Sequence, residues 1–184
     1  MNALIIFAKT PVKGRVKTRL QKNLSQTNVL KLYKEFLLQT VYTAKKVKNC
    51  KKIIACYPDK NHPYLKTLAK KFGFQLIKQE GRDLGERMRN AITDFLKNGY
   101  KKVVIIGCDS PTLPKEYIEK AFYVLNKKSL VIGPSCDGGY YLIGVRGVTP
   151  PIFNDIKFGT REVLKETLKR IPRKMLPSFH LLPF

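Results

Sequence analysis

Histidine, cysteine, acidic residues and long apolar runs are all scarce in this sequence of 184 residues. The two histidines, His62 and His180, lie in a loop-like and a tail-like stretch, which disfavours a His-based metal site or catalytic triad. The four cysteines form no CxxC pair and lack the spacing of zinc ligands. We therefore expect small, buried or half-buried thiols in a reducing compartment.

No apolar run approaches the roughly 20 residues that a membrane-spanning helix needs. The opening MNALIIFA has too short an apolar stretch, and no cleavage-like site, for a secretory signal. We therefore expect a cytoplasmic protein without a membrane partner. The length and the 43% of hydrophobic residues suit one domain over residues 1–184 with a packed core. There is no internal repeat, linker or low-complexity segment.

Acids are outnumbered by basic residues, 13 against 36, which gives a formal net charge of +23. Such a balance raises nucleic acid or an anionic membrane as a partner. The alternative is a lysine-rich surface like those of hyperthermophile proteins. Lysine pairs in NCKKIIACY, GYKKVVIIG and NKKSLVIG stand where a helix ends and a strand begins. This places them on the edge of a parallel sheet opposite to the ligand edge, which favours the surface interpretation.

Apolar bursts of strand length alternate with helical patterns along the chain. We expect strands at 3–8, 52–57, 75–78, 103–107, 130–134 and 140–145, and helices near 27–48, 63–72, 84–98, 114–126 and 161–170. Strands such as VVIIG are apolar throughout, which suits burial on both faces. The pattern predicts a three-layer α/β/α sandwich with a mainly parallel sheet. Three prolines in residues 171–184 predict an irregular tail that packs on the body or on a second subunit, as in a homodimer.

Charge on the ligand edge has a distinct pattern. The segment AKTPVKGRVKTRL, residues 8–20, follows the first strand and carries five positive charges and no acid. Asp109 ends the strand in VVIIGCDSPTLP, and Asp137 lies in the turn of LVIGPSCDGGYYLIG. Carboxylates suit Mg²⁺ or Mn²⁺, which keep open positions for phosphate oxygens. Gly14 would let backbone amides approach a phosphate. The alternative makes Asp109 a helix cap and Asp137 a turn residue.

Four motifs, AKTPVKGRVKTRL, GRDLGERM, IIGCDSPTLP and GPSCDGGYYLIG, occur in this order. Together they resemble the CofC-like transferase family of the glycosyltransferase-A (nucleotide-diphospho-sugar transferase) fold. The resemblance covers roughly residues 2–170 and is to a domain-of-unknown-function branch, associated with radical-SAM proteins and commonly labelled glycosyltransferase. It implies a Rossmann-like fold with a nucleotide across the carboxyl edge. CofC-type enzymes are guanylyltransferases.

The resemblance also implies roles for individual residues. The residues that match its phosphate loop are Lys9, Gly14, Lys17 and Arg19. Gly85 and Glu86 match the segment that meets base and ribose. Asp109 and Asp137 match the two acids that bind the metal. For Glu86 the alternative is an acid in a first helical turn, favoured by the helix dipole. Cys108 and Cys136, each directly before an acid, are expected to be buried spacers, since no histidine base stands nearby in the sequence.

The sequence therefore predicts a transferase that uses Mg²⁺ or Mn²⁺ and a nucleotide donor. In the favoured reaction an acceptor phosphate attacks a nucleoside triphosphate and releases pyrophosphate, with Lys17, Arg19 and Asp109 as the catalytic residues. The alternative within the class is glycosyl transfer from a nucleotide sugar to a small-molecule acceptor. A basic nucleic-acid-binding protein is disfavoured, because it leaves Asp109 and Asp137 without a role. A pseudoenzyme with the same fold is a further alternative.

Overall fold

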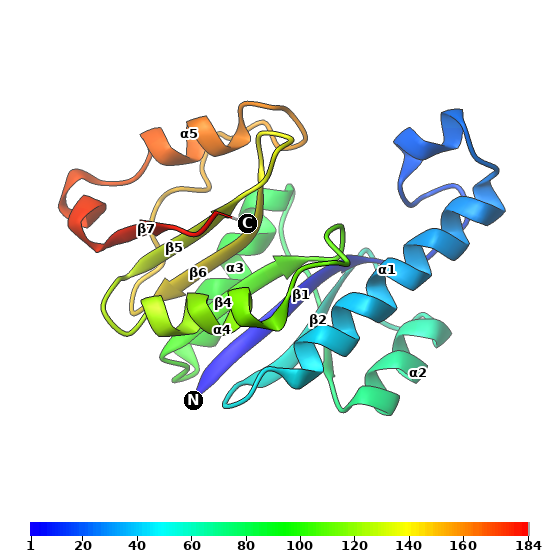
Figure 1. Ribbon diagram of the computed structural model, residues 1–184, viewed down its shortest axis with the longest axis horizontal. Coiled ribbons are helices and arrows are strands. Elements are labelled where there is room, and N and C mark those ends of the chain that lie inside the picture. The colour runs from blue at the N-terminus through cyan, green and yellow to red at the C-terminus, as the bar shows by residue number, and fades with distance from the viewer. Residues whose placement is uncertain (184) are drawn as a thin grey trace.

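A seven-stranded sheet with helices on both faces makes up the computed structural model (Figure 1). The structure describes residues 1–183, apart from the side chains of 177–179. The strands are β1 (Asn2–Lys9), β2 (Lys51–Tyr57), β3 (Gln75–Lys78), β4 (Lys102–Gly107), β5 (Leu130–Pro134), β6 (Tyr140–Arg146) and β7 (Phe179–Leu181). The helices are α1 (Gln26–Lys46), α2 (Pro63–Phe72), α3 (Leu84–Lys97), α4 (Lys115–Val124) and α5 (Val163–Lys169), with short 3₁₀ helices η1 (Thr18–Lys22) and η2 (Arg173–Ser178).

The strand order is β3-β2-β1-β4-β6-β5-β7. β6 runs antiparallel to both of its neighbours, and the other pairs are parallel. The sheet is therefore mostly parallel, as predicted. Because β5 and β6 form a hairpin, their connecting turn returns to the edge where β1, β2 and β4 end. This carboxyl edge is where ligands bind in open α/β sheets.

Alternate residues of each central strand enter two separate cores. In β1, Leu4 and Ile6 pack with buried residues of α1, α2 and α4, whereas Ala3 and Ile5 pack with buried residues of α3. Partly buried residues of α5 join the second core. This explains why the strands are apolar at successive positions, since both faces of the sheet are covered. The result is the predicted three-layer α/β/α sandwich.

The expected strands and helices of residues 1–170 are confirmed, with boundaries within two residues. The prediction of an irregular tail at 171–184 is wrong for part of it. Residues 173–178 form η2, and β7 pairs in parallel with β5. Tyr141 donates a hydrogen bond to the carbonyl oxygen of Leu182, which is buried (2.7 Å). Pro172 and Pro183 lie outside the paired residues, so these prolines do not interrupt the ladder.

The opposite, amino edge of the sheet carries the lysine pairs, as predicted. Lys51 and Lys52 begin β2, Lys101 and Lys102 stand at the start of β4, and a third pair precedes β5. Among the described residues, no helix combines the length and the apolar character that crossing a bilayer would demand.

Candidate active site

The basic loop, residues 9–19, begins where Tyr33, a buried residue of α1, contacts the end of β1. The hydroxyl of Tyr33 accepts a hydrogen bond from the backbone amide of Lys9 (2.8 Å) and donates one to the carbonyl oxygen of the same residue (2.7 Å). The thiol of Cys108 lies 3.6 Å from this hydroxyl. Burial raises the pKa of Tyr33 far above its usual value, so the hydroxyl stays neutral. Tyr33 thus ties the first residue of the loop to the residue before Asp109.

Lys17 joins the loop to the end of β4. Its ammonium nitrogen lies 2.9 Å from Oδ1 of Asp109 and 4.9 Å from the centre of the Phe36 ring. The lysine side chain is 18% exposed, whereas the carboxylate is 73% exposed. Lys17 adopts a left-handed conformation, with φ 45° and ψ 44°, which a residue with a β-carbon rarely takes. The loop therefore holds Lys17 in a strained turn that directs its ammonium group to the carboxylate.

Asp137 lies in the turn between β5 and β6. Its Oδ1 accepts hydrogen bonds from the hydroxyl of Ser135 (2.5 Å) and from the amide of Gly139 (3.1 Å). These two bonds hold the pKa of Asp137 below its usual value, and the charge of Arg19 lowers it further. The carboxylate is therefore ionised at neutral pH. The proposed turn role and a ligand role are compatible, because both bonds fall on the same oxygen.

Arg19 connects the basic loop to the segment that follows β6. Its guanidinium donates a hydrogen bond to the carbonyl oxygen of Gly159 (2.9 Å). An added β-carbon on Gly138 would lie 2.0 Å from the carbonyl oxygen of Arg161, so the segment around 159–161 also packs on the turn of Asp137. Arg19 thus reaches across the carboxyl edge toward Asp137, which explains its effect on the pKa of that residue.

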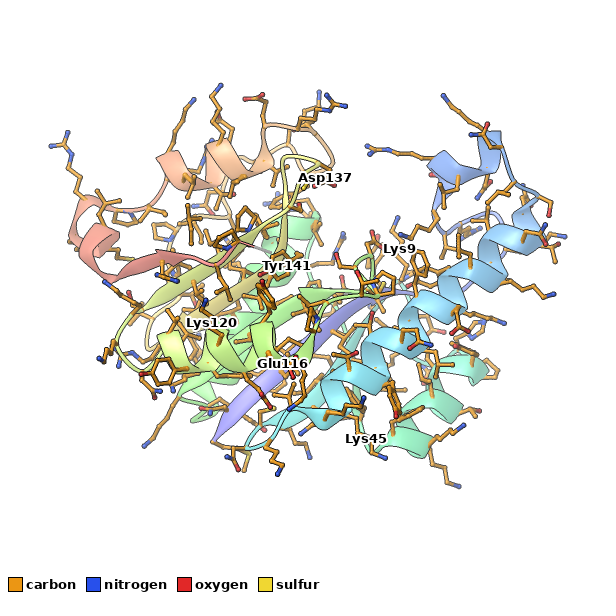
Figure 2. The ribbon with its side chains drawn as sticks, viewed as in Figure 1. Lys9, Lys45, Glu116, Lys120, Asp137 and Tyr141 are labelled. Carbon is orange, nitrogen blue, oxygen red and sulfur yellow. The ribbon has the colours of Figure 1, made fainter. Side chains whose placement is uncertain are left out.

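The two candidate metal acids extend from neighbouring strands. Ile106 of β4 is paired with Leu142 of β6, so Asp109 lies beyond one end of this ladder and Asp137 beyond the same end. Figure 2 shows Lys9 and Asp137 on one side of the molecule and Lys45 on the other. Within the described residues, no three His, Cys, Asp or Glu side chains come together in a way that could hold a metal ion.

Gly14 and Gly85 have structural reasons for being glycine. Gly14 has φ +78°, and a β-carbon there would lie 3.3 Å from Oε1 of Gln26. A β-carbon on Gly85 would lie 2.5 Å from a ring carbon of Phe158 and 2.7 Å from the carbonyl oxygen of Phe153. Gly85 thus allows α3 to pack closely on the segment after β6. The resemblance implied a contact with base or ribose, whereas the structure places Gly85 in a buried helix contact.

Glu86 caps the start of α3. The side chain of Asp83 accepts a hydrogen bond from the amide of Glu86 (2.8 Å), and Glu86 in turn accepts one from the amide of Arg82 (2.8 Å). Its carboxylate also pairs with the guanidinium groups of Arg82 (3.0 Å) and Arg89 (3.3 Å). The bonds from Arg82 lower the pKa of Glu86. Glu86 is therefore an acid in the first turn of a helix, which was the alternative to a contact with the base.

Cys108 and Cys136 differ in burial, although both were expected to be buried. Cys108 is buried, as predicted, and burial raises the pKa of its thiol to about 12. Cys136 is exposed, so its assignment as a buried spacer is wrong. The reason is its position in the turn after β5, where the chain has left the sheet. The high pKa of the Cys108 thiol is the opposite of what a reactive thiolate requires.

Two features of the carboxyl edge were not expected from the sequence. Gln79, which is buried after β3, donates hydrogen bonds to the carbonyl oxygens of Ala8 (3.2 Å) and Ala55 (2.8 Å) at the ends of β1 and β2. For Tyr33 the sequence predicts only a place in a long helix. Its place on the buried face, one turn before Leu37, was visible in the sequence, but the partners of its hydroxyl were not.

Of two cavities in the structure, one lies toward the opposite, amino edge of the sheet and the other beside the start of α3. A cavity of about 550 Å³ lies between the second half of α3 and residues 147–154, and one of about 270 Å³ lies beside the start of α3. Neither is lined by Lys17, Asp109 or Asp137.

The fold is that of nucleotide-diphospho-sugar transferases and nucleotidyltransferases. The chain belongs to the family described as uncharacterized protein conserved in bacteria (DUF2064), whose model matches residues 40–160. A structure from Desulfovibrio desulfuricans G20, provisionally named a nucleotide-diphospho-sugar transferase, is 31% identical. The match covers 99% of this chain and 79% of the Desulfovibrio chain, with a TM-score of 0.87.

More distant structures share the fold. The 4-diphosphocytidyl-2C-methyl-D-erythritol synthase of Anaerococcus prevotii DSM 20548 is 12% identical, with a TM-score of 0.58 over 99% of this chain and 87% of that chain. The glucosyl-3-phosphoglycerate synthase of Mycobacterium tuberculosis is 10% identical, with a TM-score of 0.54 over 98% of this chain and 70% of that chain. The latter structure is a complex with Mn²⁺, uridine diphosphate and glucosyl-3-phosphoglycerate. At this identity the two matches establish the fold alone.

Proposed function

We propose that the chain is a cytoplasmic transferase that moves a nucleotidyl group from a nucleoside triphosphate to a phosphorylated small molecule. The observation that carries this proposal is the contact between Lys17 and Asp109, 2.9 Å long, which joins the basic loop to the acid at the end of β4. The similarity to transferases, nucleotidyl and glycosyl, supports the reaction class. A turn role alone would explain Asp137, whereas the cap role is excluded for Asp109, because α4 begins at Lys115 with Pro114 at its N-cap position.

In the proposed reaction an oxygen of the acceptor phosphate forms a bond to the α-phosphorus of the triphosphate. The bond from that phosphorus to the bridging oxygen breaks, and pyrophosphate leaves with the electron pair. Lys9, Lys17 and Arg19 stabilise the charge that develops on the leaving group. No protein nucleophile is required, in keeping with the high pKa of the buried Cys108 thiol. Catalysis rests on positioning and electrostatics.

The acids fit Mg²⁺ or Mn²⁺ only together with a phosphate. Mg²⁺ is commonly held by one or two carboxylates and by substrate phosphates, and Asp109 and Asp137 supply two carboxylates on one edge. Bound there, the ion would supply neutralisation of phosphate charge. Lys17 already occupies Oδ1 of Asp109, so it competes with a cation for this oxygen. A nucleotide relieves the competition, because its phosphates attract Lys17.

The charge of the loop favours a triphosphate over a nucleotide sugar. A triphosphate carries a terminal phosphate with about two further negative charges at neutral pH, which a diphosphosugar lacks. The loop places five cations within residues 9–19. Helix packing accounts for Gly85 and a hydrogen bond at the start of α3 for Glu86, and a contact of either residue with the nucleotide stays a prediction.

The test incubates the protein with Mg²⁺ or Mn²⁺, separate nucleoside triphosphates or nucleotide sugars, and a pool of phosphorylated small molecules. Release of pyrophosphate together with a nucleotidylated product supports the proposal. Release of a nucleoside diphosphate from a nucleotide sugar alone would replace it with glycosyl transfer. Lys17→Ala and Arg19→Ala should weaken triphosphate binding by about ten- to a hundredfold, since charge-assisted contacts contribute roughly 1.5–3 kcal/mol each.

A further inference from the structure

The edge of the sheet opposite to the proposed active site is almost purely cationic. It is formed by residues 45–52, 70–74, 97–102 and 126–130, where helices end and strands begin, and by residues 145–149, where the antiparallel β6 ends; we call it the basic edge. These five segments contain twelve lysines, one arginine and no acid. All 13 acids of the chain therefore lie outside these five segments, although burial raises the pKa of the Cys50 thiol and Glu119 of α4 is close enough to raise it further.

Helix dipoles account for only part of this charge. α1, α2 and α3 do end in lysines, which suit the negative ends of helices. Lys48, Lys51 and Lys101 are exposed and lie beyond the helix ends. The ion pairs found among residues 1–183 involve other cations than these three. The positive charge thus exceeds what the fold requires.

Cations even crowd one another at this edge. Lys102 and Arg146 face each other across β4 and β6. Burial lowers the pKa of Lys102, and the charge of Arg146 lowers it further. Its ammonium group is held by the carbonyl oxygen of Phe122 (3.0 Å) and by the side chain of Asn126 (2.5 Å) rather than by an acid. The repulsion would be relieved by an external polyanion.

Large apolar side chains project among the lysines. Val148, directly after β6, is 79% exposed, and Met1, directly before β1, is 73% exposed. Tyr123 and Tyr42 lie near the ends of α4 and α1 and are 68% and 50% exposed. The ammonium group of Lys46 lies 4.2 Å from the centre of the Tyr42 ring. Exposed apolar groups within a basic surface are a combination that interaction sites use.

We propose that the basic edge docks on an anionic lipid bilayer. Lysines near such a surface are attracted to its headgroups, and Val148 and Met1 would enter the boundary between headgroups and acyl chains. Tyrosines suit this boundary because one end of the side chain is apolar and the other polar. Aliphatic tips have no ring to stack on a base, so these residues favour a bilayer over a nucleic acid. Such docking needs no spanning segment.

The orientation of the docked molecule follows from the fold. Lys45 belongs to the basic edge, whereas Lys9 and Asp137 lie on the opposite side (Figure 2). With the basic edge on the bilayer, the carboxyl edge would face the solution and stay open to soluble substrates. Docking and nucleotide binding are therefore independent, and a variant of one surface should leave the other unchanged.

The test is co-sedimentation of the full chain with vesicles of phosphatidylcholine, alone or mixed with phosphatidylglycerol. We expect binding to the anionic vesicles only, falling as salt is raised. The variant Lys48→Gln, Lys101→Gln, Lys127→Gln should reduce partitioning about a hundredfold, since each lysine near the bilayer contributes roughly fivefold. The matched control, Lys31→Gln, Lys60→Gln, Lys66→Gln, removes three exposed charges elsewhere and should retain most binding.

Val148→Ser tests the apolar contribution to vesicle binding separately from the electrostatic one, because it leaves the charge of the protein unchanged. It should reduce the binding that persists at high salt by about tenfold. Thermal shift with a nucleoside triphosphate checks that each variant is folded and still binds nucleotide. Equal losses in the edge variant and its matched control would overturn the proposal, because net charge alone would then explain binding. Binding to neutral vesicles would overturn it as well. So would binding to single-stranded oligonucleotides by a protein that does not bind anionic vesicles.

Discussion

Lys17 and Asp109 form an ion pair of 2.9 Å although the acid is 73% exposed and the lysine only 18%. The lysine is held in place by its left-handed backbone and by the Phe36 ring, so the pair is preorganised from the lysine side. An exposed pair of this kind contributes between zero and about 1 kcal/mol to stability. A stabilising role alone therefore does not explain this geometry.

Asp109→Asn should remove metal-dependent nucleotide binding and leave the fold intact. The change keeps the size of the side chain, and the lost ion pair costs at most about 1 kcal/mol. We expect a melting temperature near that of the parent and the loss of the further shift that Mg²⁺ or Mn²⁺ gives with a triphosphate. Asp137→Asn should behave alike in nucleotide binding. Parent-like binding in either variant would remove that acid from the proposed metal site.

The backbone of Lys17 allows its charge and its strain to be separated. Lys17→Ala and Lys17→Gly both remove the ammonium group, and both should weaken triphosphate binding to the same extent. Glycine, unlike alanine, adopts φ 45° without strain, so Lys17→Gly should be more stable by about 1 kcal/mol. Chemical denaturation of the two variants measures this difference. A more stable alanine variant would show that the loop rearranges once the lysine is removed.

The sequence predicted the architecture because both sheet faces are covered. In VVIIG every residue is apolar, and the structure sends neighbours in β4 to different cores. The tail was misjudged because prolines mark where a ladder cannot extend, not whether the residues between them pair. β7 depends on contacts with β5 that are about 50 residues distant in sequence, which no local pattern reveals.

The candidate site was predicted less completely for similar reasons. Asp109, Asp137 and the loop were placed on one edge because strand direction alone determines it. Tyr33 and Gln79 were missed, since their hydrogen bonds reach backbone atoms of distant strands. The motif of Glu86 permitted both a cap and a ligand. Only the geometry, with Asp83 and Arg82 on either side, favours the cap.

Gly85→Ala tests the packing role of this glycine. A β-carbon would meet Phe158 at 2.5 Å and the carbonyl oxygen of Phe153 at 2.7 Å, and the backbone atom cannot turn away. Overpacking of this kind costs about 1–3 kcal/mol, against up to about 1 kcal/mol gained in helix propensity. We expect a lower melting temperature, partly restored by adding Phe158→Leu. No restoration by the second change would contradict the ring contact.

Glu166 predicts a dependence of stability on acid pH. Its hydrogen bonds with Lys169 and Arg170 lower its pKa to about 2. Because the folded value lies below the unfolded one, the stabilisation is present above the unfolded pKa and lost as the pH falls toward about 2. The melting-temperature difference between the parent and Glu166→Gln should therefore be constant above the unfolded pKa and vanish at the acid end. In a Lys169→Gln, Arg170→Gln background the same substitution should have little effect at any pH.

Tyr33→Phe tests whether the buried hydroxyl positions the site or only stabilises the fold. The change leaves the amide and carbonyl groups of Lys9 without their partner, at a cost of about 1–3 kcal/mol. Tyr64→Phe is the matched control, since that hydroxyl bonds the carbonyl oxygen of Lys34 in α1 (3.0 Å) and not a residue of the basic loop. Both variants should lose stability.

Only Tyr33→Phe should also weaken metal-dependent triphosphate binding, by about tenfold, because Lys9 and the residue before Asp109 both contact this hydroxyl. Binding is measured by calorimetry well below the melting temperatures of both variants, with and without Mg²⁺. A positioning role predicts that the metal-dependent part of the affinity falls while binding without metal changes little. Equal affinities for Tyr33→Phe and Tyr64→Phe would reduce Tyr33 to a structural residue, since loss of stability alone affects the two variants in the same way.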